Sequence, residues 1–400
     1  STNCYFSIYL FGWETLVINI KYMKIGIITI FGITNYGSAL QAYALQKYIS
    51  TLPNCKAELI NYVYPNKFHK SKKGTLIKKI RNKAHVIKEI LFNYKYQRKY
   101  KFKQFGKKFH ILSPQEYKSI EEIEKNPPLY DIYVTGSDQV WNIYSLKNDP
   151  VMYCSFAPSG AKKIAFGASM AIKKLPSEFI QSIQERLSTY SFIGVRESSG
   201  VNIINSLGLP NNIIISETCD PTLLLSSEQY SEIAQDSKLN IKGEFVLVYF
   251  LDYAFDPHPA IEKVIDTIKK TFKIPIIVIG SSKIHCAAHF RYINNIGPSD
   301  FVWLMEQATY IITSSFHGLM FSLIFRKPFT AIAPATTDNK DSRIEDVLKT
   351  TGLINRMITS NSSEISIDIS TPFSTTVEFK IHDYINHSKI LLHKALGFSV

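Results

Sequence analysis

The chain has 400 residues, of which 45% are hydrophobic and 20% are charged, a balance that is typical of folded globular proteins and excludes an intrinsically disordered chain. Its five cysteines form no CxxC pair, which excludes a disulfide framework and favours a reducing, cytoplasmic compartment. The spacing of His285, Cys286 and His289 resembles metal-ligand spacing, but no second ligand cluster completes a zinc site. We therefore expect no metal and no bound cofactor.

The positive charge is concentrated in one segment of the chain. Lys and Arg number 46 against 33 Asp and Glu, for a net charge of +13, yet residues 67–108 alone hold 16 basic residues and one acidic residue, Glu89. That segment carries +15, so the remainder carries 13 − 15 = −2. The protein is predicted to be an ordinary α/β protein with a basic insertion, and nucleic acid is not an expected partner.

Residues 1–22 are largely apolar but are interrupted by Glu14 and lack a basic start and a small-residue cleavage site. They fit neither a signal peptide nor a run of about 18 apolar residues that could span a membrane. Because a strand pattern begins at Met23, we expect residues 1–22 to be an extension outside the fold. A genuine first strand or an interfacial anchor remains the alternative.

From Met23 onward, short apolar runs alternate with helical patterns. The predicted strands of a first series are 24–30, 57–63, 131–135, 164–167, 192–195 and 213–216, with helices over 38–48, 177–188 and 197–207. After a polar connector over 226–242, a second series has strands over 244–251, 274–279, 310–313 and 328–332, with helices over 257–271, 299–308 and 319–325. Strands that are apolar throughout are typical of parallel sheets covered on both faces. We predict two Rossmann-like domains, 23–235 with the insertion 67–108 and 236–400, that face a ligand-binding cleft.

The first predicted strand runs into a turn and a helix start at Asn35, Gly37 and Ser38. Such a turn directs backbone N–H groups and the positive end of a helix dipole at the space above the strand. These residues are candidates for binding an anion, or they serve only to make the turn.

A second polar cluster follows the strand 131–135 and contains Asp138, Gln139, Trp141 and Asn142. Asp138 could accept a proton, and the other three could contact a sugar, with Trp141 as a flat apolar platform. The structural alternative makes Asp138 a cap and Trp141 a core residue.

Two further strand ends carry charged residues. Arg196 follows the strand 192–195 beside Glu197, where a guanidinium can hold a carboxylate or phosphate at two points, or pair with Glu197 or another acid. Asp220 begins the segment CDPTLLL, where an aspartate can contact an acceptor or simply start a turn.

The strongest local pattern is ITSSFHGLMF, in which a strand stops at Ser314 and Ser315 while His317 and Gly318 open an apolar helix. An imidazole at a helix N-terminus that faces a cleft can bind an oxyanion and exchange a proton near neutral pH. Arg343 lies further along, at a charged helix start, from which it could reach the cleft or face solvent.

Within the basic insertion, apolar residues recur at spacings of three and four, which draws one apolar stripe along a helix surrounded by lysines. The stripe comprises Leu76, Ile80, Ala84, Ile87, Leu91 and Tyr94. Such a helix can lie on an anionic membrane surface and dock an acceptor, or pack on the first domain with a solvated charged face.

Seven motifs, in their order along the chain, resemble those of the polysaccharide pyruvyl transferase family. They are NYGSALQAYAL, YVTGSDQVWN, FGASMA, IGVRESSG, CDPTLLL, ITSSFHGLMFSLIF and SRIEDVL. The resemblance spans roughly residues 24–353. It implies a two-domain fold of the glycosyltransferase-B type and transfer of a pyruvyl group from phosphoenolpyruvate onto two sugar hydroxyls, giving a cyclic ketal in bacterial surface polysaccharides.

On this resemblance, Arg196 and His317 take donor-binding or catalytic positions, and His317 and Asp138 are the candidate acid and base. Many members carry Arg two residues before the motif His, where this chain has Ser315, so another cation such as Arg343 would have to hold the donor. The resemblance implies a sugar acceptor and leaves open whether the sugar is linked to a lipid pyrophosphate and whether the protein contacts the membrane surface. Two other functions remain open at this stage: a nucleotide-sugar glycosyltransferase of the same fold, and a non-catalytic protein that binds membrane or nucleic acid.

Overall fold

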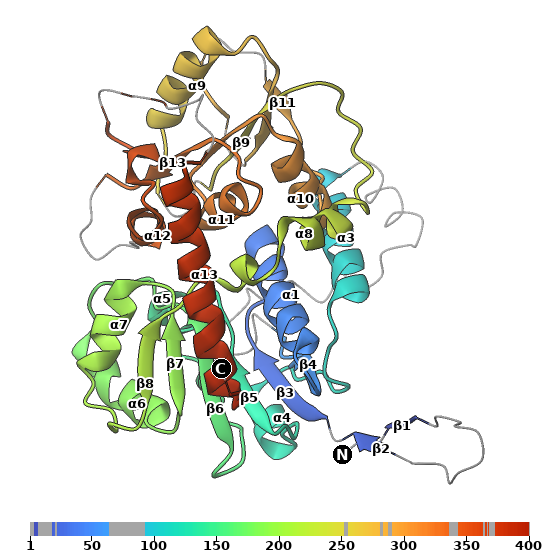
Figure 1. The fold of residues 1–400 in the computed structure, drawn as a ribbon, viewed down its shortest axis with the longest axis vertical. Helices are drawn as coiled ribbons and strands as arrows, with labels where there is room; N and C mark the ends of the chain where they lie inside the picture. Colours follow the sequence, from blue (N-terminus) through green and yellow to red (C-terminus); the bar gives the residue numbers. More distant parts are fainter. Residues whose placement is uncertain are drawn as a thin grey trace, which may run out of the picture.

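The computed structural model describes residues 22–63, 93–251, 255–280, 283–286, 290–335, 343–362, 365, 367 and 373–399, together with the backbone of 4–6 and 18–20. Two six-stranded sheets, each built only from parallel strand pairs, form the centres of two layered units (Figure 1). The predicted α/β fold with two Rossmann-like domains is confirmed.

The first sheet has the strand order β4-β3-β5-β6-β7-β8. Its strands are β3 (Met23–Ile28), β4 (Cys55–Leu59), β5 (Ile132–Thr135), β6 (Lys162–Ala168), β7 (Phe192–Val195) and β8 (Ile214–Glu217). The helices of this half are α1 (Tyr36–Thr51), α3 (Tyr94–Phe109), α4 (Ile120–Lys125), α5 (Ile143–Leu146), α6 (Ser177–Leu187) and α7 (Ser198–Asn205), with 3₁₀ turns η2 (Pro150–Tyr153) and η3 (Pro221–Leu224).

The second sheet has the order β11-β10-β9-β12-β13-β14. Its strands are β9 (Val246–Tyr249), β10 (Ile276–Ile279), β11 (Phe290–Tyr292), β12 (Tyr310–Thr313), β13 (Phe329–Ala333) and β14 (Met357–Thr359). Its helices are α8 (Ser227–Ala234), α9 (Ala260–Thr271), α10 (Pro298–Gln307), α11 (Phe316–Ile324) and α12 (Arg343–Thr351), with the 3₁₀ turn η4 (Ile354–Arg356).

The central strands are buried on both faces, as their uninterrupted apolar sequences require. Every residue of β5, β7, β9 and β12 is buried. Helices on both sides of each sheet supply the cover, and the carboxyl ends of the strands in both sheets are where loops can gather polar groups.

The last helix, α13 (Thr375–Leu396), runs from the second domain back along the first, where the C-terminus lies (Figure 1). Near its end, the backbone N–H of Cys219 donates to Ser388 Oγ at 2.9 Å, and Tyr48 Oη lies 3.0 Å from His393 Nε2. The division expected at residue 235 therefore does not describe α13, because this helix packs on the first domain.

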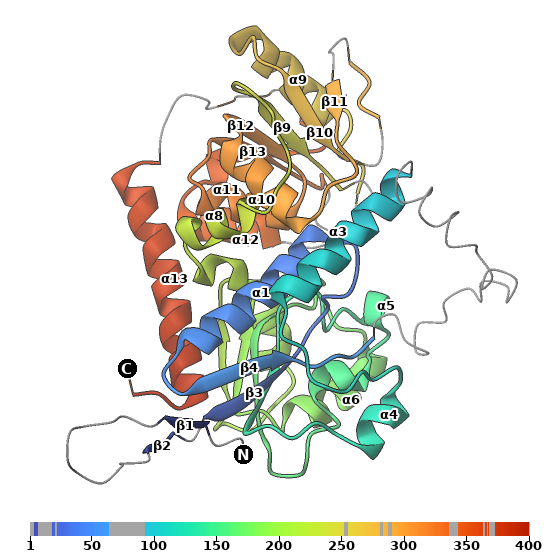
Figure 2. The same ribbon diagram turned by 90° about the vertical axis from the view of Figure 1, so that its right-hand side faces the viewer.

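Side chains of α1 and α3 join the two domains. The ring of Tyr36 stacks on Phe301 of α10 with centroids 4.8 Å apart, and Lys101 Nζ lies 2.8 Å from Asp300 Oδ2. Figure 2 shows α3 lying along α1 on the side that faces the second domain. This packing brings the β3–α1 turn against the second sheet.

The sequence also led to expectations for residues 1–22, for the basic insertion and for membrane-spanning segments. Strands β1 (Cys4–Phe6) and β2 (Ile18–Ile20) pair with each other in antiparallel fashion and project away from the body of the fold (Figure 1). Of the predicted amphipathic stripe, only Tyr94 falls within the described residues. No helix in the described part of the chain is long and apolar enough to cross a membrane.

Candidate active site between the domains

The β3–α1 turn is held by its own side chains. Asn35 is the N-cap of α1, and its Oδ1 accepts a hydrogen bond from the backbone N–H of Ser38 at 3.2 Å. Ser38 Oγ in turn donates to Asp138 Oδ2 at 2.5 Å. The turn after β3 and the turn after β5, which are separated by 100 residues in the sequence, therefore meet at one point.

Asp138 occupies a tight turn with a positive φ of 75°, a conformation that Asp tolerates better than most residues. Its Oδ1 accepts from the backbone N–H of Gln139 at 2.8 Å. Both carboxylate oxygens thus have a donor from the protein, and the side chain is aimed back at α1.

The remaining members of the second cluster build the loop instead of facing the cleft. Asn142 caps α5 by accepting from the N–H groups of Tyr144 and Ser145, and Gln139 Oε1 accepts from Asn142 Nδ2 at 2.8 Å. Trp141 is 1% exposed, stacks on Tyr153 with centroids 5.4 Å apart, and donates to Met152 O. The interpretation of Trp141 as a sugar platform is wrong for this structure, because packing covers its faces.

Asp220 lies at the centre of a buried polar cluster. Its Oδ2 accepts from Arg196 Nη1 at 2.5 Å and from Ser137 Oγ at 3.0 Å, while its Oδ1 accepts from Thr222 Oγ1 at 2.7 Å. His317 Nε2 lies 3.6 Å from the same Oδ2. Burial by itself raises the pKa of Asp220, but the nearby His317 imidazole and the charge of Arg196 outweigh it and hold this pKa below its usual value. Asp220 is therefore ionised at neutral pH and anchors the cluster from within, which is not the acceptor contact expected from the sequence.

Arg196 pairs with Asp220 and not with its neighbour Glu197, whose Oε1 accepts from the backbone N–H groups of Met170 and Ala171. The Arg196 side chain has no exposed surface, yet its Nε and Nη2 have no hydrogen-bond partner among the described residues. Nε2 of His317, which is itself 8% exposed, also has none. Buried donors without partners are costly, so these atoms mark a place where the protein is arranged to meet a polar ligand or water.

His317 is positioned by both domains. Ser315 caps α11 by accepting from the N–H of Gly318 at 3.3 Å, which places His317 in the first turn of that helix. The imidazole packs directly on Gly37 of α1, where a Cβ atom would lie 1.9 Å from His317 Nδ1. Gly318 likewise allows close packing, because its Cβ would lie 2.2 Å from Thr313 Oγ1. The start of α1 therefore contacts the His317 motif directly in the structure.

Ser314 connects the site to β9. Its Oγ accepts from the backbone N–H of Leu251 at 2.9 Å. Both serines before the motif histidine therefore accept hydrogen bonds from backbone N–H groups. Ser314 does so just after β9, and Ser315 at the start of α11.

Two guanidinium groups lie against the ring of Phe316, the residue before His317. Arg196 Cζ is 4.8 Å from the ring centroid and Arg343 Cζ is 5.1 Å from it. Arg343, the first residue of α12, is 6% exposed. The structure therefore brings Arg343 beside the cluster, as the sequence suggested, whereas Asp341 lies outside the described residues.

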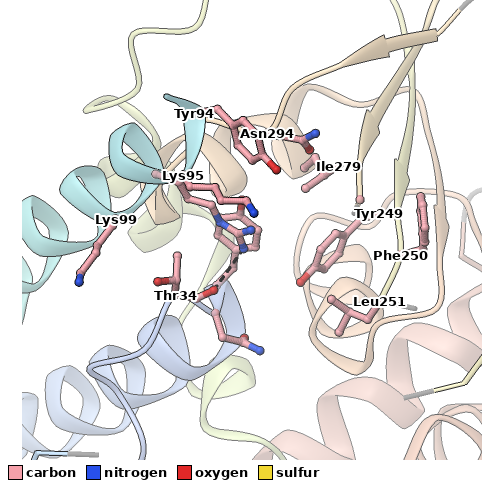
Figure 3. A pocket seen from close by; sticks show the side chains of 13 residues that line it. Thr34, Tyr94, Lys95, Lys99, Tyr249, Phe250, Leu251, Ile279 and Asn294 are labelled. Atoms are coloured by element: carbon pink, nitrogen blue, oxygen red, sulfur yellow. Dashed lines mark hydrogen bonds between the residues drawn. The ribbon is translucent and has the colours of Figure 1, made fainter. Parts of the chain in front are cut away.

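A pocket of about 570 Å³ opens between the domains next to this cluster. Lys95 and Tyr94 of α3 reach over it from one side, and Tyr249 at the end of β9 and Leu251 just after it face it from the other (Figure 3). The remaining lining residues are Thr34, Asn35, Tyr36, Arg98, Lys99, Phe250, Ile279, Gly280 and Asn294. Because Asn35 caps the helix that carries Gly37 and Leu251 is bonded to Ser314, the pocket adjoins the His317 cluster.

Sequence reasoning did not single out the pocket residues Tyr249, Lys95 and Arg98. The excess of basic residues in 67–108 was a signal for the two cations, but their orientation depends on how α3 packs. No group of three or more His, Cys, Asp or Glu side chains that could hold a metal occurs in the parts of the chain that the structure describes.

The fold and the site together define a two-domain α/β enzyme with a polar cleft. A family model for polysaccharide pyruvyl transferase matches residues 35–336, which include Gly37, Asp138, Arg196, Asp220 and His317. The chain belongs to the polysaccharide pyruvyl transferase family, and it is therefore a transferase.

Solved structures show the same architecture at low sequence identity. A putative UDP-N-acetylglucosamine 2-epimerase from Listeria monocytogenes is 10% identical with a TM-score of 0.51, the comparison covering 94% of this chain and 91% of that chain. The UDP-GlcNAc 2-epimerase of Methanocaldococcus jannaschii, in complex with UDP-GlcNAc and UDP, is 14% identical with a TM-score of 0.50 over 93% of this chain and 100% of the other. No curated protein matches the sequence. At these identities the solved structures establish the fold alone, which is of the glycosyltransferase-B type.

Proposed function

We propose that this transferase moves the pyruvyl group of phosphoenolpyruvate onto two hydroxyls of a sugar and forms a cyclic ketal, in the synthesis of bacterial surface polysaccharide. The observation that carries the proposal is the buried Arg196–Asp220–His317 cluster, which holds unpartnered nitrogen atoms. Through Gly37 and Ser314, this cluster is in contact with the segments that line a cationic pocket. A donor with a carboxylate and a phosphate needs two anion sites close to a proton donor. This arrangement offers both.

The reaction has a fixed balance of atoms. A proton adds to the methylene carbon of the donor, one sugar hydroxyl attacks the adjacent carbon, the bond from that carbon to the phosphate oxygen breaks, and the second hydroxyl closes the ring. Of the two hydroxyl protons released, one replaces the proton used on carbon and the other leaves with the phosphate. The step therefore needs one group that gives and takes a proton, and a second that removes one.

His317 is our proposed acid and base. Its Nε2 faces the ionised Asp220 at 3.6 Å, which orients the ring and stabilises the positive charge that it carries when protonated. Asp138 is the second proposed proton acceptor, and it would act on a hydroxyl near Ser38, which already donates to its Oδ2.

Arg343 is our proposed replacement for the arginine that many family members carry at the position of Ser315. The guanidinium groups of Arg343 and Arg196 both lie against the ring of Phe316, which brings the two cations to one part of the site. Ser315 and Gly318 belong to the start of α11, which we assign to the same anion site, although the Gly318 N–H itself is occupied by Ser315 Oγ. At the start of α1, the Ser38 N–H is already occupied by Asn35, which reduces what that turn can offer an anion.

We also propose a cytoplasmic location, because Cys55, Cys154 and Cys219 are buried free thiols that a reducing compartment preserves. Whether the acceptor sugar is carried on a lipid is taken up below.

The test is mass spectrometry of a panel of glycans incubated with the protein and phosphoenolpyruvate. We expect one glycan to gain the mass of pyruvate less one water, with release of an equal amount of phosphate. Transfer of a sugar from a nucleotide sugar, without any phosphate release from phosphoenolpyruvate, would instead support a glycosyltransferase.

A further inference from the structure

A second hollow, of about 540 Å³, lies beside the cleft between α3, α1 and the loop that follows β3. We name it the α3 groove. Phe31, Ile33, Ala39, Phe102 and Leu112 contribute apolar surface to it, and its lysines are Lys99, Lys103 and Lys107. Apart from Lys99, which also lines the pocket between the domains, none of these residues has a part in the proposed reaction.

The lining of the α3 groove is uncharged except for those lysines. His110 contacts Phe31 edge to face at 5.6 Å, and its Nε2 lies 3.0 Å from the carbonyl oxygen of Ala39. Burial lowers the pKa of His110 to about 4, although the bond to Ala39 opposes the shift. The imidazole is therefore neutral at pH 7, and the groove presents aromatic and aliphatic surface, which suits a hydrocarbon.

The three lysines form a row along one side of α3. They occur at positions i, i+4 and i+8 and are exposed, so successive members are about 6 Å apart along the helix axis. Lys101 and Lys108, by contrast, pair with Asp300 and Asp236. No ion pair with Lys99, Lys103 or Lys107 occurs in the described part of the chain. The row can therefore meet an external anion at the edge of an apolar surface.

The α3 groove continues into the cleft. Thr34 and Lys99 border both hollows, and Lys95 and Arg98, nearer the start of the same helix, line the pocket. In Figure 3, Lys99 extends from α3 away from Tyr249 and Leu251, whereas Lys95 reaches towards the pocket. A ligand could thus place a polar end in the pocket and an apolar tail in the groove.

We propose that the α3 groove binds the lipid phosphate that carries the acceptor sugar. The hydrocarbon chain lies against Phe31, Ile33 and Phe102, the phosphate groups meet Lys99 and Lys103, and the attached sugar turns past Thr34 into the pocket. The sugar part of this assignment rests on the proposed function, whereas the binding of a lipid phosphate can be tested without it. Inorganic phosphate alone would leave the apolar surface unused, which is why we assign a lipid.

Binding of farnesyl diphosphate to the full chain, measured by isothermal titration calorimetry, tests the assignment. We expect it to bind more tightly than either inorganic pyrophosphate or farnesol, since only the diphosphate ester engages both the lysines and the apolar surface. Replacing Lys99, Lys103 and Lys107 together by Gln should weaken binding at least about tenfold. Higher salt should also weaken binding to the wild type, because it screens the attraction between the lysines and the diphosphate. The matched control replaces the exposed Lys125, Lys270 and Lys273 by Gln, which makes the same change in net charge and should leave binding unchanged.

A second variant, Ile33→Asn, tests the apolar surface without adding charge, and its thermal unfolding shows whether the fold is kept. It should reduce the affinity for farnesyl diphosphate and leave that for pyrophosphate within about twofold. Equal affinity for pyrophosphate and farnesyl diphosphate, equal loss in the control triple variant, or no binding of farnesyl diphosphate would each overturn the proposal. Intact binding of the probe together with no pyruvyl transfer to any glycan would refute the proposed function and leave the groove assignment standing.

Discussion

His317 is the side chain on which the two domains converge, since Gly37 of α1 packs on one side of its ring and Asp220 faces its Nε2. We predict that His317→Ala lowers the turnover of pyruvyl transfer by about 10²- to 10⁴-fold, the usual cost of losing a general acid or base. His317→Asn is the matched variant, because it keeps a polar side chain but cannot exchange a proton near pH 7. Turnover near that of the wild type in either variant would remove His317 from the mechanism.

Gly37 has a helical backbone and needs to be glycine only because of its neighbour. A Cβ at this position would lie 1.9 Å from His317 Nδ1, so Gly37→Ala must displace the imidazole or separate the two domains. We predict a loss of turnover that approaches that of His317→Ala.

Gly106→Ala in α3 is the control for this substitution. Its Cβ would meet only His110 Nδ1, at an ordinary distance of 3.6 Å, and Ala is favoured over Gly inside a helix by roughly 0.5–1 kcal/mol. It should preserve turnover. If Gly37→Ala proves equally harmless, the contact between the turn and the imidazole has no catalytic importance.

Arg196 offers a planar group with two nitrogen atoms that have no partner among the described residues. Arg196→Lys can keep an ion pair with Asp220 but cannot present the remaining guanidinium N–H groups to an anion. We predict that it raises the KM for phosphoenolpyruvate more than the KM for the acceptor. Steady-state kinetics with each substrate varied in turn provides the test, and a change confined to the acceptor KM would contradict donor binding by Arg196.

At the scale of elements, α13 supports the loop that carries Asp220. The N–H of Cys219 donates to Ser388 Oγ, and both groups are fully buried. Ser388→Ala leaves this N–H without a partner, so we predict a loss of about 1–3 kcal/mol in the free energy of unfolding. Urea unfolding measures it, with His387→Ala at an exposed position of α13 as the control. A loss no larger than that of the control would mean that α13 does not stabilise the Asp220 loop through this bond.

The elements differ in how far their sequences predict them. Central strands such as β5 and β12 are apolar throughout, and their positions were predicted because burial on both faces leaves little choice of residue type. The edge strands β11 and β14, each three residues long, were not predicted, since so short a run has no periodicity to detect. Helix α11 begins at Phe316, three residues before its predicted start, because the cap at Ser315 outweighs the polar residues of its first turn.

The sequence predicted which strand ends carry the site residues, but it did not predict which of these residues contact one another. Asn35, Asp138, Arg196 and His317 were found because polar residues directly after apolar strands are conspicuous. Trp141 was misjudged, since a tryptophan at a strand end looks the same in the sequence whether it faces a cleft or the core. The pairing of Arg196 with Asp220, and not with the adjacent Glu197, depends on how η3 packs against α1 and α11, which no local pattern contains.

At the scale of the whole molecule, the two domains also meet through acidic groups. Asp346 of α12 accepts from the backbone N–H and Oγ of Ser198 at the start of α7. Burial raises the pKa of Glu217, at the end of β8, to about 7, and the charges of Asp346 and Glu197 add to the shift. The packing of the two domains thus holds carboxylates from both near one another. The free energy that this costs the folded protein depends on pH.

The sign of that dependence follows from the direction of the shift. A carboxyl whose pKa is about 7 in the folded protein and near 4.5 in the unfolded chain binds its proton more tightly when folded, so its contribution to stability falls as pH rises from about 4.5 to 7. We predict that Glu217→Gln flattens the decline in midpoint of urea unfolding between pH 5 and pH 8. Glu185→Gln, on the exposed surface of α6, is the matched control and should follow the wild-type profile. Parallel profiles for the wild type and Glu217→Gln would show that Glu217 does not hold its proton in the folded state, and that the contact between α12 and the β8 end carries no dependence on pH.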